Sequence, residues 1–68
     1  MTLKEYRVNL GGTQNVLADK AGLNWSVVRQ AEDGKPIRAT SAKAFADALS
    51  KALGIDIKPS GLEGSNVQ

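Results

Sequence analysis

Glycines divide this chain into short segments, and within each segment the apolar residues recur with the spacing of an α-helix. No segment alternates apolar and polar residues convincingly over the length of a strand. The segments end at Gly11-Gly12, Gly22, Gly34 and Gly54. Glycine readily takes the left-handed conformation that follows a helix. The sequence therefore predicts a small all-α bundle of four to five helices.

Capping signals define the first two helices. Thr2 followed by Glu5 fits a capping box, in which each side chain satisfies a free backbone N–H at a helix start. These residues predict a helix over roughly 2–9. Thr13 is a suitable N-cap for a second helix, Gln14–Ala21, whose apolar residues share one face.

Two further helices are expected in the second half of the chain. Asn24 is a good N-cap for a helix over Trp25–Glu32. After a basic loop, Thr40 or Ser41 caps a fourth helix, Ala42–Leu53, which carries a broad apolar stripe. We interpret this stripe as core rather than as a cofactor site.

The end of the chain offers little to bury. Ile55 and Ile57 are expected to tuck back under the core. From Pro59 onward the chain is rich in Gly, Ser and Asn, which predicts a disordered tail over residues 58–68. The folded domain is accordingly expected to span residues 1–57.

Composition argues against most enzyme classes. The 68 residues include no cysteine and no histidine, so the usual zinc and haem ligands and the common nucleophile–base pairs are missing. We expect no enzyme, no metal and no cofactor. No apolar run is long enough to span a bilayer, and no secretory signal is evident, so we expect a cytoplasmic protein without membrane contact. The net charge of +2 is weak evidence for a nucleic-acid partner by itself.

Residues 13–34 have the pattern of a helix-turn-helix. Ala18 falls where two helices would cross, and its small side chain lets the backbones approach. Gly22 supplies the positive φ of a tight turn, and Leu23 is expected to plug that turn. Val28 follows at the spacing this motif requires.

The same segment resembles a known family. Residues 13–24 read TQNVLADKAGLN, close to the S/T-Q-x-x-L-A-x-K-x-G-V/L-S/N run of the phage Cro/repressor-type helix-turn-helix family, which includes the lambda repressor. The family's continuation is matched at Val28, Ala31, Glu32 and Gly34. The resemblance covers roughly Leu3–Ile57. It implies a lambda-repressor-like bundle and a sequence-specific transcriptional regulator, a repressor of phage or mobile-element type.

The resemblance also implies which residues contact double-stranded DNA. Helix 25–32 would lie in the major groove, with Trp25, Ser26, Arg29 and Gln30 facing the bases. Helix geometry gives the same four residues, because Val28 and Ala31 face inward. Arg29 suits guanine and Gln30 suits adenine, since each can form two hydrogen bonds to that base. Phosphate contacts are expected from Gln14, Lys35 and Arg38.

Arg7 falls where many family members carry an arginine that pairs with the residue matching Glu32, so we expect a structural ion pair. Asp33 departs from the family and should repel phosphate. No clear fifth helix follows Gly54, so the family's dimer surface is not evident. We expect a monomer in dilute solution that forms a homodimer on a pseudo-palindromic DNA site.

A second function class stays open. The alternative is a protein-binding module, such as an antitoxin that binds a partner protein. The residues proposed for DNA also have plain structural readings: Trp25 as a lid on the core, and Arg29 and Gln30 as solvated helix surface. DNA binding with a steep salt dependence would separate the two classes.

Overall fold

Helices make up most of the protein, which confirms the predicted all-α class. The computed structural model describes residues 2–62, 64, 66 and 67. In chain order its elements are α1 (Leu3–Leu10), α2 (Gln14–Ala21), α3 (Trp25–Glu32), β1 (Pro36–Ile37), α4 (Ala39–Leu53), the 3-10 helix η1 (Pro59–Gly61) and β2 (Asn66–Val67). The bounds of α2 and α3 are those that the capping signals predict.

Side-chain capping defines the starts of α1 and α2, whereas Asn24 is the N-cap of α3 without a hydrogen bond from its side chain. The backbone N–H of Thr2 donates to Glu5 Oε1 at 2.8 Å, and the N–H of Glu5 donates to Thr2 Oγ1 at 3.1 Å, which confirms the capping box. The Thr2 hydrogen bond lowers the pKa of the Glu5 carboxyl below its usual value. Thr13 Oγ1 accepts from the N–H of Val16 in the same way.

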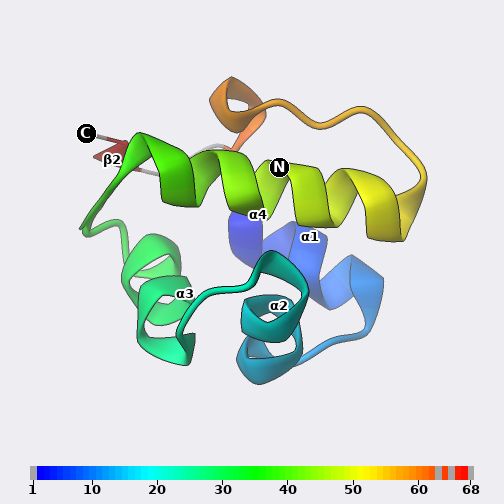
Figure 1. Ribbon diagram of the computed structural model, residues 1–68, viewed down its shortest axis with the longest axis horizontal. Coiled ribbons are helices and arrows are strands. Elements are labelled where there is room, and N and C mark those ends of the chain that lie inside the picture. The colour runs from blue at the N-terminus through cyan, green and yellow to red at the C-terminus, as the bar shows by residue number, and fades with distance from the viewer. Residues whose placement is uncertain (1, 63, 65, 68) are drawn as a thin grey trace.

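α4 organises the bundle. It runs along one side of the molecule, and α1, α2 and α3 lie beneath it (Figure 1). α1 and α2 pack directly against α4, and α3 packs mainly on α2. The four α-helices contribute to one buried cluster, whose members include Leu3, Leu17, Ala18, Val28, Ala31, Ala42, Phe45, Ala46 and Leu49. Because one continuous core joins α3 to α2 and α4, the position of α3 is fixed by packing on its inner side.

α4 begins three residues before the predicted Ala42, so the expectation of a cap at Thr40 or Ser41 is wrong. Arg38 is the N-cap, in extended conformation, and contributes no side-chain cap. Ile37, directly before it, is only 5% exposed. Because the Ile37 side chain is buried in the core, the chain turns at this residue, and α4 begins two residues later at Ala39.

Ile57 is buried as expected, but Ile55 is 52% exposed, so that half of the prediction is wrong. The Ile57 N–H donates to Ser50 Oγ at 2.8 Å, and the Ser50 hydroxyl lies 3.1 Å from the Ile57 carbonyl oxygen. These contacts fix the segment after α4 so that Ile57, rather than Ile55, faces inward.

The tail differs from the disordered segment predicted for residues 58–68. η1 brings Leu62 into the core, where it is 4% exposed. β2 then pairs with β1 as a two-stranded parallel sheet, with Asn66 opposite Pro36 and Val67 opposite Ile37. Residues 63, 65 and 68 lie outside the described part of the chain. The tail therefore returns to the connection between α3 and α4 (Figure 1).

No helix in the described part of the chain combines the length and the apolar character that a membrane crossing requires.

Candidate nucleic-acid interface

α2 and α3 form a tightly joined pair. Ala18 on α2 is 3% exposed, and the Leu23 N–H donates to the Ala18 carbonyl oxygen at 2.9 Å. Gly22, between the two helices, has φ +69°, a conformation that other residues adopt only at a cost. These contacts give the short, fixed turn that the sequence predicts. Leu23 is half-buried and packs against the core.

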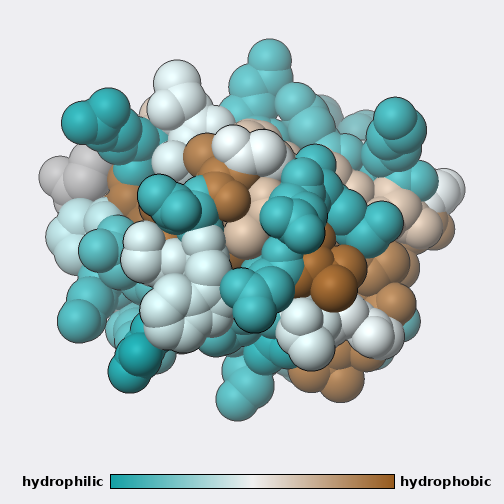
Figure 2. All heavy atoms as spheres, turned by 60° about the horizontal axis from the view of Figure 1, so that its bottom comes forward, coloured by the Kyte–Doolittle hydropathy of each residue, from teal (hydrophilic) through white to brown (hydrophobic). Residues whose placement is uncertain are grey.

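The outer face of α3 carries the four residues expected to face DNA bases. Val28 and Ala31 are buried on the inner side, while Trp25, Ser26, Arg29 and Gln30 are all exposed. Figure 2 turns the α2–α3 side toward the viewer: residues of hydrophilic to intermediate hydropathy cover most of the α3 side, and hydrophobic residues gather at the opposite side. α3 therefore presents a polar surface on a rigid support.

Two of these four residues contact each other. The Arg29 guanidinium carbon lies 5.7 Å from the centroid of the Trp25 ring, within the range of a cation–π interaction. Arg29 Nε is also 3.9 Å from Asp33 Oδ2, a loose pair between side chains that are 63% and 52% exposed. An exposed pair of this kind contributes little to stability. Arg29 is thus held lightly and stays accessible.

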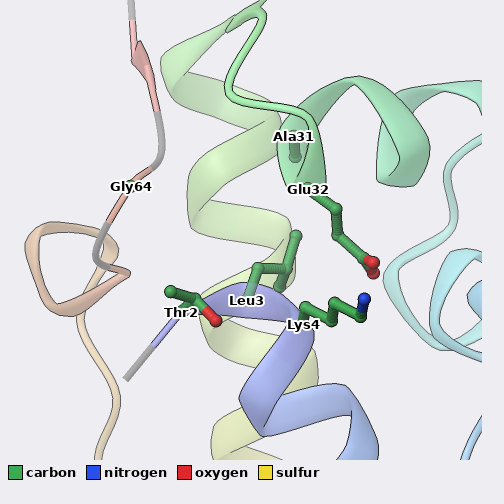
Figure 3. A pocket seen from close by; sticks show the side chains of 6 residues that line it. All are labelled: Thr2, Leu3, Lys4, Ala31, Glu32 and Gly64. Carbon is green, nitrogen blue, oxygen red and sulfur yellow. The ribbon is translucent and has the colours of Figure 1, made fainter.

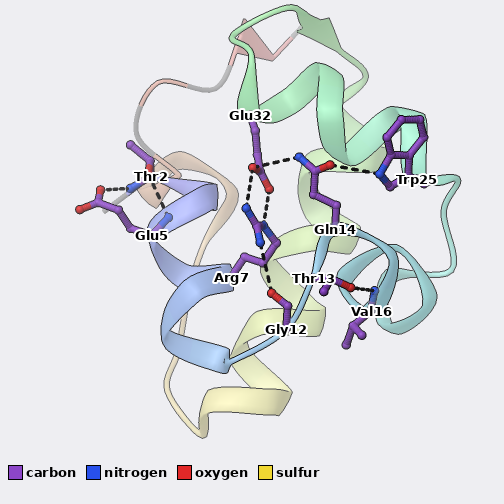
Figure 4. Close-up of polar contacts among 9 residues, drawn as sticks. All are labelled: Thr2, Glu5, Arg7, Gly12, Thr13, Gln14, Val16, Trp25 and Glu32. Atoms are coloured by element: carbon purple, nitrogen blue, oxygen red, sulfur yellow. Dashed lines mark hydrogen bonds and ion pairs between the residues drawn. The ribbon is translucent and has the colours of Figure 1, made fainter.

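Gln14, the expected phosphate contact, lies in a chain of internal hydrogen bonds. Its Nε2 donates to Glu32 Oε1 at 3.2 Å, and its Oε1 accepts from Trp25 Nε1 at 3.1 Å (Figure 4). The structure thus brings Gln14 and Trp25 together. The sequence analysis missed this contact, and neither residue carries a sequence signal for it.

The far end of that chain is the expected ion pair. Arg7 Nε donates to Glu32 Oε2 at 2.7 Å and Arg7 Nη2 donates to Glu32 Oε1 at 3.1 Å, which confirms the pair. Arg7 Nη1 also donates to the Gly12 carbonyl oxygen at 3.2 Å. The two side chains are only 14% and 4% exposed, so the pair is largely withdrawn from solvent. It links α1 to the last turn of α3.

The two loop cations lie near the end of α3. The Lys35 N–H donates to the Gln30 carbonyl oxygen at 2.9 Å, which turns the chain back directly after α3. Arg38 and Gln30 border one shallow hollow between α3, β1 and the start of α4. Lys35 and Arg38 are exposed. The structure thus brings Arg38 close to one member of the α3 face, while Lys35 stands just beyond the helix.

A second hollow lies between α1, the end of α3 and the tail. It is lined by Thr2, Leu3, Lys4, Ala31, Glu32 and Gly64. In Figure 3 the Lys4 ammonium points toward the Glu32 carboxylate. The Glu32 carboxylate already accepts hydrogen bonds from Arg7 and Gln14, so we assign it to the ion pair and not to a binding site in this hollow. Among the described residues, no group of three or more acidic side chains comes together as a metal site.

Comparison of the chain with protein-family models, with curated protein sequences and with solved structures gives no match.

Proposed function

We propose that this protein is a sequence-specific DNA-binding transcriptional regulator, a repressor of the Cro/repressor type, that reads the major groove with α3. The observation that carries the proposal is the outer face of α3, where Trp25, Ser26, Arg29 and Gln30 are exposed on a helix whose other side is buried. The major groove admits an α-helix. We infer a binding protein of the cytoplasm rather than an enzyme.

The chemistry of this face suits the edges of bases. Arg29 can donate two hydrogen bonds to guanine O6 and N7, and Gln30 can pair with adenine N6 and N7. Ser26 can donate or accept one hydrogen bond. Such groups discriminate bases only when the helix cannot shift, and the burial of Val28 and Ala31 supplies that rigidity.

Phosphate contacts would hold the helix in register. Lys35 and Arg38 follow α3 and are exposed, as a flanking contact to the DNA backbone requires. Asp33 works against binding, because its carboxylate is 52% exposed beside Arg29 and would repel phosphate. A single small module makes few contacts, so we propose that two copies pair on a pseudo-palindromic site.

Selection of bound sequences from a random DNA pool tests this function. We expect an enriched site with two half-sites spaced by about one helical turn, ~34 Å. Affinity for that site should fall steeply as salt rises, because phosphate contacts release counterions. Failure to enrich any sequence, with equal weak binding to all DNA, would contradict the proposal.

A second candidate, a protein-binding module such as an antitoxin, has one observation in its favour. Val8 and Val16 are exposed apolar side chains, 60% and 40% exposed. Val16 and Leu10 lie on either side of Gly12, where an added Cβ would touch both. Exposed apolar surface, such as the hydrophobic patch that Figure 2 shows away from α3, suits a protein partner better than DNA. A Val8→Ser, Val16→Ser double variant that keeps full DNA binding but loses a co-purifying protein would favour this second role.

A further inference from the structure

The hydrogen-bond chain under α3 has a fixed direction. Glu32 Oε1 accepts from Arg7 and from the Gln14 amide nitrogen, and the Gln14 amide oxygen accepts from the Trp25 indole N–H (Figure 4). Turning the Gln14 amide over would set its NH₂ against the indole donor and its oxygen against the carboxylate. The largely buried Arg7–Glu32 pair thus fixes the Gln14 amide.

Gln14 in turn fixes the indole of Trp25. Trp25 is the first residue of α3 and is 43% exposed, so packing alone leaves much of its ring in solvent. The indole nitrogen has a single N–H to donate, and Gln14 Oε1 accepts it at 3.1 Å. This bond occupies the polar group that Trp25 would otherwise offer to DNA.

Arg29 lies between two side chains that attract its guanidinium, Trp25 one helical turn before it and Asp33 one helical turn after it. Toward the start of α3, the Trp25 ring attracts its guanidinium at 5.7 Å, and toward the end of the helix Asp33 attracts it at 3.9 Å. Residues near the N-terminal part of a reading helix are those that reach base edges. The ring therefore biases Arg29 toward the bases, and the Asp33 carboxylate biases it away from them.

We propose that Trp25 is a positioning residue for Arg29 and sets the base preference of α3 through it. Gln14 and the Arg7–Glu32 pair hold the ring in place. This inference rests on the proposed function, in which Arg29 reads a base. It assigns Gln14 to the support of Trp25 rather than to a phosphate contact. The base preference at the Arg29 position then depends on a residue of α2 that need not touch DNA.

The variant Gln14→Met tests, in the absence of DNA, whether Gln14 holds the Trp25 ring in place. Methionine has a similar length, but its sulfur accepts a hydrogen bond from the indole N–H far more weakly than an amide oxygen does. Glu32 keeps both hydrogen bonds from Arg7. We expect the NMR signals of the Arg29 guanidinium, shifted by the ring current of Trp25, to move toward those of Trp25→Leu. The indole N–H should exchange with water faster.

The matched control is Asn15→Met, which changes the adjacent exposed residue of α2 and should alter neither signal. Circular dichroism checks that each variant keeps its helices. Arg29 signals in the folded protein that are identical in wild type, Gln14→Met and Trp25→Leu would overturn the proposal.

A double-mutant cycle on the selected DNA site tests the consequence. Gln14→Met should reduce the preference at the base pair read by Arg29 about two- to fivefold, the range of an exposed cation–π contact. In an Arg29→Ala background Gln14→Met should have no further effect. Equal weakening of all sequences in both backgrounds would identify Gln14 as a phosphate contact and overturn the proposal. If no DNA sequence is enriched, the proposed function fails, and the NMR comparison decides the positioning role.

Discussion

The connections on either side of α3 are built differently. Both begin with a local hydrogen bond, from the Leu23 N–H to the Ala18 carbonyl and from the Lys35 N–H to the Gln30 carbonyl. The first connection, Gly22–Asn24, spans only three residues. The second, residues 33–38, contains β1, whose partner β2 comes from the far end of the chain. Local contacts shape the first connection, whereas the second combines a local turn with pairing to the returning tail.

This difference divides the candidate interface into two parts. The first connection fixes α3 against α2, and with it the face that would read bases. The second carries Lys35 and Arg38, whose proposed role is to hold phosphates. Changes in the tail should therefore disturb the segment that carries Lys35 and Arg38 more than they disturb the α2–α3 pair.

The largest expected effect comes from Leu62→Ala. Leu62 is 4% exposed and lies in the core cluster, so its truncation should lower the free energy of unfolding by about 2–5 kcal/mol. Urea unfolding measures the loss. Ile55→Ala is the matched control, because Ile55 is 52% exposed and its truncation should change stability little. Equal, small losses in both variants would mean that the tail does not contribute to the core.

Ala18→Leu should have the next largest effect, because it acts on the first connection. Ala18 is 3% exposed where α2 packs on α3, and three extra carbons would force the helices apart. Overpacking of this kind costs about 1–3 kcal/mol. The thermal midpoint should fall clearly. An unchanged midpoint would mean that the close approach of α2 and α3 does not depend on a small residue at this position.

The smallest expected effects come from Gly22→Ala and Gly34→Ala, which test both connections alike. Their φ angles are +69° and +75°, so a Cβ is strained at either site. An added Cβ would meet nothing within 4 Å at Gly22 and only the Gly64 carbonyl oxygen at 3.8 Å at Gly34. Each change should cost about 1–2 kcal/mol in urea unfolding. A much larger loss of stability in Gly34→Ala than in Gly22→Ala would mean that the tail crowds the second connection, and the two glycines would then not be equivalent.

The sequence predicts the elements whose signals are local. The capping box at Thr2 and Glu5, the cap at Thr13 and the turn at Gly22 involve residues within a few positions of one another, and all are present. The buried and exposed sides of α3 follow from helical spacing alone. The Arg7–Glu32 pair is the opposite case. Its partners come from two different helices, so only the resemblance to a family predicts it.

The features missed by sequence analysis depend on distant partners. Leu62 stands alone in a Gly/Ser-rich segment, and only the packed bundle offers it a place in the core. Ile55 and Ile57 are equally apolar, and the Ser50 contact selects Ile57. The Gln14–Trp25 hydrogen bond joins two polar groups whose spacing identifies neither as the other's partner. Periodicity describes one element at a time and does not show such contacts.

The central claim is that α3 reads sequence while the second connection holds the DNA backbone. Competition binding to single-base variants of a selected site, with Arg29→Ala compared with Arg38→Ala, tests it most directly. Arg29→Ala should cost about 1–3 kcal/mol and relax preference mainly at one G·C pair. Arg38→Ala should weaken all sites alike and lower the salt slope by about one ion. An Arg29→Ala variant that weakens every site equally, or none, would contradict the claim.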